Sequence, residues 1–268
     1  MPASFEYYVL DQNVVSHPPT VAGLHERFRS VGQRIVLSTF ARYEMTKGSF
    51  KGFLRSISEI AKVPQSVVVA LPTHNIAMLE VERGASIDDP SDYESTRNFR
   101  DMLAMYRAGP RFTKSIESIY VYEKDRAARA YDPDQWRHFY KSAAEELRPL
   151  IQNEQNEGRA LRLVLIDSFR ANLTSIIEGI KPAAHAAPLL TSFPSMLAIR
   201  VMADITNSAT WGAKRNDWTT DDIEQLAHDG VDVEGAVLAC RGAAFVTEDT
   251  RARKLAEQVR HFVKEIWG

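Results

Sequence analysis

Short apolar segments and longer amphipathic segments alternate unevenly along the 268-residue chain. Residues 6–10 (EYYVL) and 34–38 (RIVLS) are apolar and rich in β-branched or aromatic side chains, which predicts two strands. Between them, Val21, Leu24 and Phe28 are spaced three and four residues apart, which predicts a helix beginning at Thr20. A strand, a helix and a second strand form a unit that builds parallel sheets.

Two further strands complete the predicted sheet. Residues 66–71 (SVVVAL) follow a helical segment at 50–63, and residues 243–249 (AAFVTED) precede a helical segment that begins at Thr250. The two ends of the chain therefore predict one α/β domain with a central parallel sheet.

The middle of the chain has a different pattern. Long amphipathic segments between residues 84 and 211 are separated by breakers at 89–90, 109–110, 132–133, 181–182 and 193–194, each of which contains proline. Residues 161–166 (LRLVLI) fit a strand or a helix, and the Ala, Arg and Ser residues around them favour a helix. We predict a core domain made of residues 1–83 and 212–268, with an all-helical insertion at 84–211.

Composition and charge narrow the function classes. The 44% hydrophobic and 25% charged residues are typical of a globular protein with a substantial core. A net charge of −2 provides no general attraction to polyanions, so nucleic-acid binding would depend on local basic residues or metal ions. One cysteine, Cys240, cannot form an internal disulfide, and the sequence has neither a long apolar run nor the features of a signal peptide. We expect a cytoplasmic protein that does not use a membrane.

Acidic residues follow two of the predicted strands. Asp11 ends the first strand and Asp249 ends the last. In open parallel sheets the carboxyl edge is where ligands bind. Aspartate is also a favourable N-cap of a following helix, so each residue alone fits a structural role as well as a functional one.

Glu44 lies in a predicted helix between a Ser38 cap and a Gly48 stop. Its neighbours at helical spacing are apolar, so the glutamate is expected on the face turned toward the sheet. An unpaired buried carboxylate costs several kcal/mol, so Glu44 needs a cation. A salt bridge to Arg42 or Lys47 and a bound metal ion both satisfy this need.

A further acid, Asp232, precedes a stretch of small and apolar residues, 233–242, that predicts a short helix with Asp232 at its N-cap. Other acids nearby are alternatives for any role given to Asp232: Asp217, Asp221, Asp222, Asp229 and Glu234.

The order of these acids resembles the PIN-like nuclease family, the PIN ribonucleases. YVLDQN is similar to the first-strand D-x-N/S signature of that family, and STFARYEMTKG to its second motif, which carries a helical glutamate. DVEGAVLACRGAAFVTED resembles the closing block, in which an apolar strand ends in T-x-D. The resemblance covers residues 5–83 and 215–268. It implies a three-layer α/β/α fold, and the helical insertion has no counterpart in the small PIN toxins.

The resemblance implies a metal-dependent endoribonuclease, with structured DNA as the alternative substrate. Several carboxylates in one pocket repel each other unless a hard divalent cation neutralises them, and oxygen ligands suit Mg²⁺ or Mn²⁺. The predicted catalytic residues and metal ligands are Asp11, Glu44, Asp232 and Asp249. Asn13 and Thr247 are expected to hold water or a phosphate oxygen, and Arg251 to contact a phosphate.

Other roles stay open at this stage. A non-catalytic protein could keep the fold and bind a partner through the helices. The helical insertion could form a homodimer, bind another protein, cover the substrate or complete the core. A toxin, an RNA-processing enzyme and a defence effector all fit the same residues.

Overall fold

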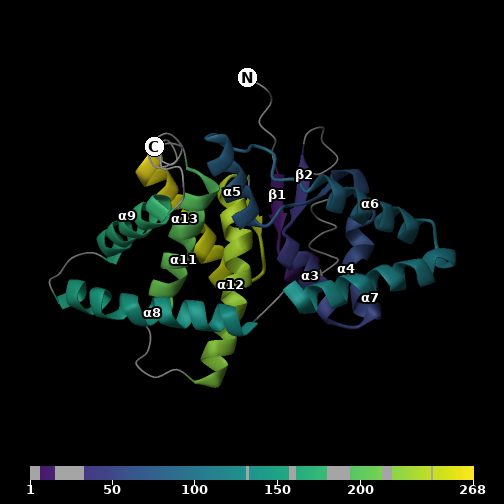
Figure 1. Ribbon diagram of the computed structural model, residues 1–268. Helices are drawn as coiled ribbons and strands as arrows, with labels where there is room; N and C mark the ends of the chain where they lie inside the picture. Colours follow the sequence, from purple (N-terminus) through teal and green to yellow (C-terminus); the bar gives the residue numbers. More distant parts are fainter. Residues whose placement is uncertain are drawn as a thin grey trace. The chain divides into compact units, whose positions relative to one another are not determined.

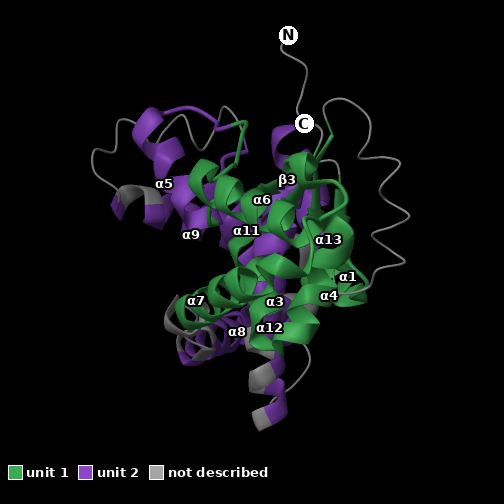
Figure 2. Cartoon of the chain, turned by 90° about the vertical axis from the view of Figure 1, so that its right-hand side faces the viewer, with its two compact units in different colours: residues 1–72, 88–132, 241–253 green, residues 73–87, 133–240, 254–268 purple. Residues whose placement is uncertain are grey.

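A computed structural model describes residues 7–15, 33–130, 133–156, 161–179, 194–212, 219–242 and 244–268. The predicted helix from Thr20 lies outside these residues. The chain divides into two compact units, coloured separately in Figure 2. Unit 1 comprises residues 1–72, 88–132 and 241–253, and unit 2 comprises residues 73–87, 133–240 and 254–268.

Unit 1 contains a four-stranded, all-parallel sheet in the order β3-β2-β1-β4. Its strands are β1 (Tyr7–Leu10), β2 (Arg34–Leu37), β3 (Val67–Val69) and β4 (Ala244–Val246) (Figure 1). In the register, Tyr8 pairs with Ile35 of β2 and with Ala244 of β4, so the N-terminal strand is central. The predicted α/β class with a parallel sheet is confirmed.

Strand β4 is shorter than predicted, because it ends at Val246 and not at Asp249. Beyond Val246 the backbone turns away from the ladder, and the N–H of Glu248 donates to the side chain of Asn13 at 3.2 Å. Residues 247–249 therefore form a loop at the carboxyl edge of the sheet.

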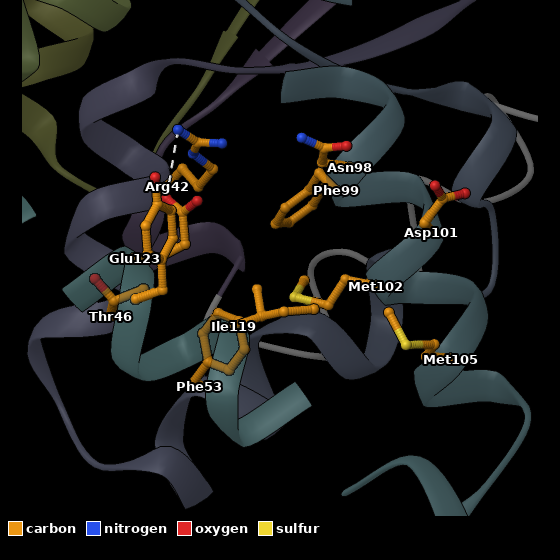
Figure 3. A pocket seen from close by; sticks show the side chains of 11 residues that line it. Arg42, Thr46, Phe53, Asn98, Phe99, Asp101, Met102, Met105, Ile119 and Glu123 are labelled. Carbon is orange, nitrogen blue, oxygen red and sulfur yellow. Dashed lines mark ion pairs between the residues drawn. The ribbon is translucent and has the colours of Figure 1, made fainter. Parts of the chain in front are cut away.

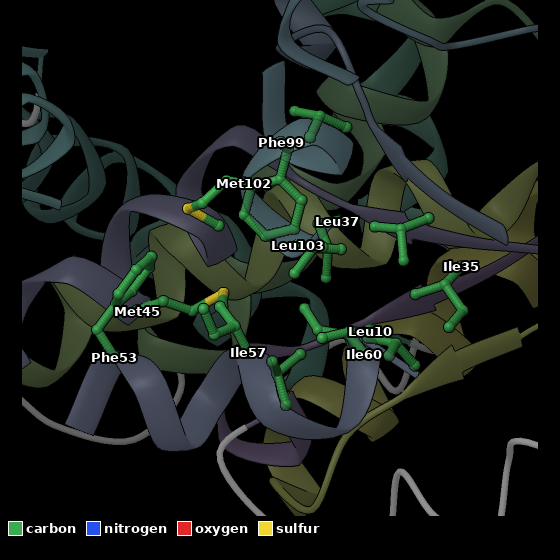
Figure 4. Packing of buried hydrophobic residues seen from close by; sticks show 14 of the residues in the cluster. Leu10, Ile35, Leu37, Met45, Phe53, Ile57, Ile60, Phe99, Met102 and Leu103 are labelled. Carbon is green, nitrogen blue, oxygen red and sulfur yellow. The ribbon is translucent and has the colours of Figure 1, made fainter. Parts of the chain in front are cut away.

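The hydrophobic core of unit 1 lies on one face of the sheet (Figure 4). Alternate strand residues, including Leu10, Ile35 and Leu37, contact apolar side chains such as Phe53 and Met102. These come from α4 (Phe50–Ile60) and α6 (Tyr93–Arg107), and α7 (Thr113–Ala130) adds Ile116 and Tyr120. The residues between them on the strands, Val9, Val36 and Val68, are also buried, as expected for parallel strands.

Local capping explains where the helices of unit 1 begin. Helix α3 (Thr39–Lys47) starts after Ser38, whose Oγ accepts a hydrogen bond from the Ala41 N–H at 2.9 Å, and ends before Gly48. Asp92 caps α6 in the same way through the Ser95 N–H. The remaining short elements of unit 1 are α1 (Gln12–Val15) and the 3₁₀ turns Pro64–Ser66 and Pro110–Phe112.

The regular elements of unit 2, in the residues that the structure describes, are all helices. Helix α11 (Met196–Gly212) packs against α5 (Thr73–Arg83), α8 (Pro133–Asn156), α9 (Leu161–Gly179) and α12 (Thr220–Cys240). The ambiguous segment 161–166 is helical, as predicted. Helix α13 (Thr250–Trp267) begins in unit 1, and from Lys254 onward its residues belong to unit 2.

A buried ionic network lies in unit 2. Arg200 donates to Glu234 at 2.7 Å and to Asp204 at 2.9 Å. Glu234, which is fully buried, also accepts from the backbone N–H of Thr73 at 2.5 Å and from its hydroxyl at 2.7 Å. The hydroxyl of the buried Tyr140 donates to Asp204 at 2.7 Å. Each carboxylate of this network thus has Arg200 as its cation and accepts a further hydrogen bond from Thr73 or Tyr140.

The compact units do not follow the boundaries predicted for the core and the insertion. Helices α6 and α7, within the predicted insertion, belong to unit 1, whereas α5 and α12 belong to unit 2. Whether residues 84–211 are an insertion into a PIN-like core stays a prediction. Helices in the described part of the chain are all too short or too polar to cross a membrane.

Candidate functional site

Asp11 stands at the carboxyl end of the central strand, between β1 and α1. Its backbone N–H donates to the carbonyl of Val246 at 3.1 Å, so it is still paired with the end of β4. The side-chain Oδ1 accepts from the N–H of Gln12 at 2.6 Å, and the carbonyl accepts from Val15 at 3.1 Å. Asp11 therefore occupies the predicted edge of the sheet and also begins a short helix.

Thr247 joins the loops that follow β1 and β4. Its buried hydroxyl donates to Asp11 Oδ2 at 2.7 Å, and its Oγ accepts from the Asp249 N–H at 3.0 Å. The Asn13 amide lies 3.4 Å from the same oxygen. The structure thus brings the side chains of Asp11, Asn13 and Thr247 together with the backbone N–H of Asp249.

Asp249 is the N-cap of α13. Its Oδ1 accepts from the N–H groups of Arg251 at 2.6 Å and Ala252 at 3.1 Å. The Arg251 side chain is exposed on the first turn of this helix. Arg253, which the sequence analysis did not select, donates from Nη2 to the carbonyl of Thr247 at 2.7 Å and so holds the loop in place.

Glu44 has a cation partner within the protein. Lys47 Nζ lies 2.9 Å from Glu44 Oε1, and the glutamate side chain keeps 19% of its surface exposed. Of the alternatives left open by the sequence, the structure contains the salt bridge to Lys47. Arg42, the other candidate partner, is nearly buried and pairs with Glu123 instead, at 3.5 Å.

Two neighbouring acids act on the charge of Asp11 at this edge. Desolvation by burial is the main cause that raises the pKa of Asp11 above its ordinary value of 3.8, and the negative charges of Glu44 and Asp249 raise it further. Hydrogen bonds from Thr247 and Gln12 act in the opposite direction but do not cancel the rise. Ionised Asp11 is therefore held at an electrostatic cost.

The donor set suits a hard divalent cation only in part. Carboxylate, amide and hydroxyl oxygens are the ligands that Mg²⁺ and Mn²⁺ prefer. Within the described residues, however, no three His, Cys, Asp or Glu side chains lie close enough to hold one ion. Asp11 and Asp249 accept hydrogen bonds from protein groups, and Glu44 pairs with Lys47. A metal ion would have to replace some of these donors.

The position predicted for Asp232 at a helix N-cap is wrong. Helix α12 begins at Thr220, so Asp232 lies in its interior, within unit 2. Two alternatives nearby have structural roles in that unit: Asp229 accepts from Trp211 Nε1 at 2.7 Å, and Glu234 binds Arg200. Asp222 accepts a hydrogen bond from the N–H of Thr219, and Asp221 lies in the same first turn of α12. Asp217 lies outside the described residues.

Comparisons with known proteins found no matching family model, no matching curated protein and no matching solved structure. Unit 1 has a mixed α/β fold with an all-parallel sheet, and the acids Asp11, Glu44 and Asp249 are called its acidic edge below.

Proposed function

We propose that the protein is a metal-dependent nuclease of the PIN-like type that cleaves RNA at the acidic edge of unit 1. The observation that carries the proposal is the link through Thr247, which binds Asp11 across 236 residues of chain and also accepts from the Asp249 N–H. Two acids from distant segments meet at the carboxyl edge of a parallel sheet, where ligands bind in such folds.

Electrostatics support a cation at this edge. Glu44 and Asp249 both raise the pKa of Asp11, so three carboxylates share a region in which their charges repel. Perturbed acids of this kind concentrate at functional sites. Asp11 would hold Mg²⁺ or Mn²⁺, with Asp249 and Glu44 as further ligands directly or through water. Once bound, the ion would supply a nucleophilic water and offset charge on the phosphoryl oxygens.

The chain's own groups have distinct tasks in this proposal. Thr247 orients the Asp11 carboxylate by donating to Oδ2, and Asn13 holds the loop after β4 through the Glu248 N–H. Arg251 is exposed beside Asp249 and can contact a phosphate of the substrate. Arg253 keeps Thr247 in position through the Thr247 carbonyl.

Cleavage and metal binding test the proposal separately. Labelled single-stranded RNA, single-stranded DNA and duplexes are incubated with the protein in Mg²⁺, Mn²⁺ or EDTA, and Mn²⁺ binding is measured by calorimetry. Asp11→Asn and Asp249→Asn are each expected to lower cleavage by at least about a hundredfold and to weaken metal binding. Glu248→Gln, which changes the exposed acid between Thr247 and Asp249, is the matched control and should cut normally.

Cutting that persists in EDTA would show that the metal mechanism is wrong. Metal-dependent cutting of DNA alone would identify a DNA nuclease instead. The toxin, processing and defence settings would follow from the RNA that is cut.

One specific observation favours a second candidate, a non-catalytic protein that binds a partner or a second copy of itself. All three acids already have protein donors, and no three acids in the described residues form a metal cluster. Absence of both metal binding and cleavage in the same experiment would favour this candidate. Sedimentation velocity would then show whether the protein self-associates.

A further inference from the structure

Unit 1 contains a cavity of about 350 Å³ between helices α3, α4, α6 and α7 (Figure 3). It does not belong to the acidic edge described above. Arg42 lines the cavity from α3, whereas Glu44 is two residues further along the same helix. Side chains two residues apart project from opposite sides of a helix, so the two sites use different faces of α3.

Arg42 is the unusual residue of this cavity. Only 5% of its side chain is exposed, and its Nη2 lies 3.5 Å from Glu123 Oε2, which is an ion-pair distance and longer than most hydrogen bonds. The buried Nε of Arg42 and the Oε2 of Glu123 have no hydrogen-bond partner. A guanidinium group offers five N–H donors, and buried polar groups are normally hydrogen-bonded. The cavity therefore carries a donor and an acceptor that lack partners.

The rest of the lining divides into polar and apolar parts. Asn98 places its side-chain amide at the same end of the cavity as Arg42 (Figure 3). Phe99, Met102 and Ile119 supply apolar surface from α6 and α7. Ligand sites usually combine a mostly apolar lining with a few placed polar groups, in volumes of roughly 300–1,000 Å³. This cavity lies at the small end of that range.

Charge restricts the chemistry of an occupant. The positive charge of Arg42 is already balanced by Glu123, and Asp101 adds a further carboxylate at the exposed rim. A free anion would gain little binding energy, because these carboxylates already neutralise the positive charge of Arg42. A purely apolar molecule would leave Arg42 Nε and Glu123 Oε2 without hydrogen bonds. A neutral group with an acceptor next to a donor satisfies both side chains.

We propose that this cavity binds a nucleobase through a lactam edge, the adjacent carbonyl and N–H groups that guanine and uracil carry. The base carbonyl accepts from the Arg42 guanidinium, and the base N–H donates to the Glu123 carboxylate. The ring contacts Phe99 and Met102. Adenine has no carbonyl oxygen and is the poorer ligand. The inference does not depend on the proposed nuclease activity, because free nucleosides and bases within a strand carry the same edge.

Direct binding of nucleosides to the full chain tests the proposal. Guanosine, uridine, adenosine and 3-methyluridine are titrated and binding is followed by calorimetry and ligand-observed NMR. Guanosine and uridine are expected to bind. 3-Methyluridine keeps both carbonyls but lacks the N–H, so it should bind at least about tenfold more weakly than uridine, and adenosine likewise. A short uridine oligonucleotide separates a strand from a free nucleoside as the source of the base.

Two variants locate the binding. Arg42→Lys keeps the positive charge beside Glu123 but loses the planar donor fork, so binding should weaken by about tenfold. Ile119→Trp, at a partly buried position, fills the cavity and should abolish binding while both members of the ionic pair are kept in the chain. Glu117→Trp, on an exposed position of the same helix, is its matched control and should bind normally. Circular dichroism checks that each variant is folded.

Several results would overturn the proposal. They are equal binding of uridine and 3-methyluridine, unchanged binding in Ile119→Trp, or no nucleoside binding at millimolar concentration. In the last case, water fills the cavity and satisfies Arg42.

Discussion

Replacing Arg200 with methionine would leave two carboxylates of unit 2 without their cation. Glu234 is fully buried and the Asp204 side chain is 17% exposed, so solvent screens neither charge well. Breaking a buried ion pair by removing one partner typically costs about 3–5 kcal/mol, because the remaining charge stays uncompensated. Methionine has nearly the length of the arginine stem, so the loss of packing is small by comparison.

The free energy of unfolding lost in Arg200→Met would be a large part of the total stability. Domains are stable by about 5–15 kcal/mol, and a change of about 3–5 kcal/mol should lower the melting temperature by roughly 6–20 °C in a chain of this length. Urea unfolding followed by circular dichroism measures the free energy of unfolding. Burial lowers the pKa of Arg200, but attraction from Asp204, Tyr140 and Glu234 raises it above its ordinary value overall. The loss should therefore be the same throughout the neutral pH range.

Two comparisons make this prediction specific. Lys141→Met removes the cation of an exposed pair with Glu145, 3.9 Å apart on α8, and should cost less than about 0.5 kcal/mol. Adding Glu234→Leu to Arg200→Met removes one of the two uncompensated charges and should recover part of the loss. The reasoning is refuted if Arg200→Met costs no more than Lys141→Met does.

Three other substitutions test unit 1. Asp11→Asn should raise the free energy of unfolding at neutral pH. The pKa of Asp11 is raised above 3.8 in the folded protein, so the stability that protonated Asp11 provides below pH 3.8 is lost as the pH rises through the pKa of the folded state. The stabilisation by asparagine should therefore vanish in acid, and a stabilisation that does not depend on pH would contradict this cause. Thr247→Val removes a buried donor to Asp11 and should cost about 1–3 kcal/mol in urea unfolding, against little change in the exposed Thr250→Val. Gly242→Ala should cost about 1–3 kcal/mol, since a Cβ there would lie 2.5 Å from Tyr7 Cε2 and 2.9 Å from its carbonyl oxygen. Gly179→Ala has open space at its Cβ and should leave the free energy of unfolding in urea nearly unchanged.

Local signals in the sequence predicted the elements of the sheet and α3 well. Apolar β-branched runs gave the four strands, and Ser38 and Gly48 bounded α3 because capping depends on neighbouring residues alone. Helix α12 was predicted too short because Asp232 is a residue type that favours the N-cap of a helix. In the structure Gly230 is buried within α12, and packing of this helix against α8 and α11 outweighs the cost of glycine, about 1 kcal/mol.

The site was predictable where residues follow strand ends, and less so elsewhere. Asp11 and Thr247 could be placed together because parallel strands share one carboxyl edge. The role of Arg253 could not be predicted, because nothing in its sequence neighbourhood indicates that its side chain turns back to the Thr247 carbonyl. The partner of Glu44 could have been chosen from helical spacing, because Lys47 is three residues away on the same face of α3 and Arg42 is two residues away on another face.

The pairing of β1 with β4 has a consequence for the order of folding. Strand β2 follows β1 closely in the chain, but Asp11 and Thr247 are separated by 236 residues. Closing the longer loop costs about 2 kcal/mol more in chain entropy than closing the shorter one, so β4 should join the sheet late. During synthesis, β1 can therefore pair with β2 while its other edge stays open. Asp11 acquires Thr247 and Asp249 only after those residues have left the ribosome, which keeps the acidic edge incomplete until β4 and the loop after it have been synthesised.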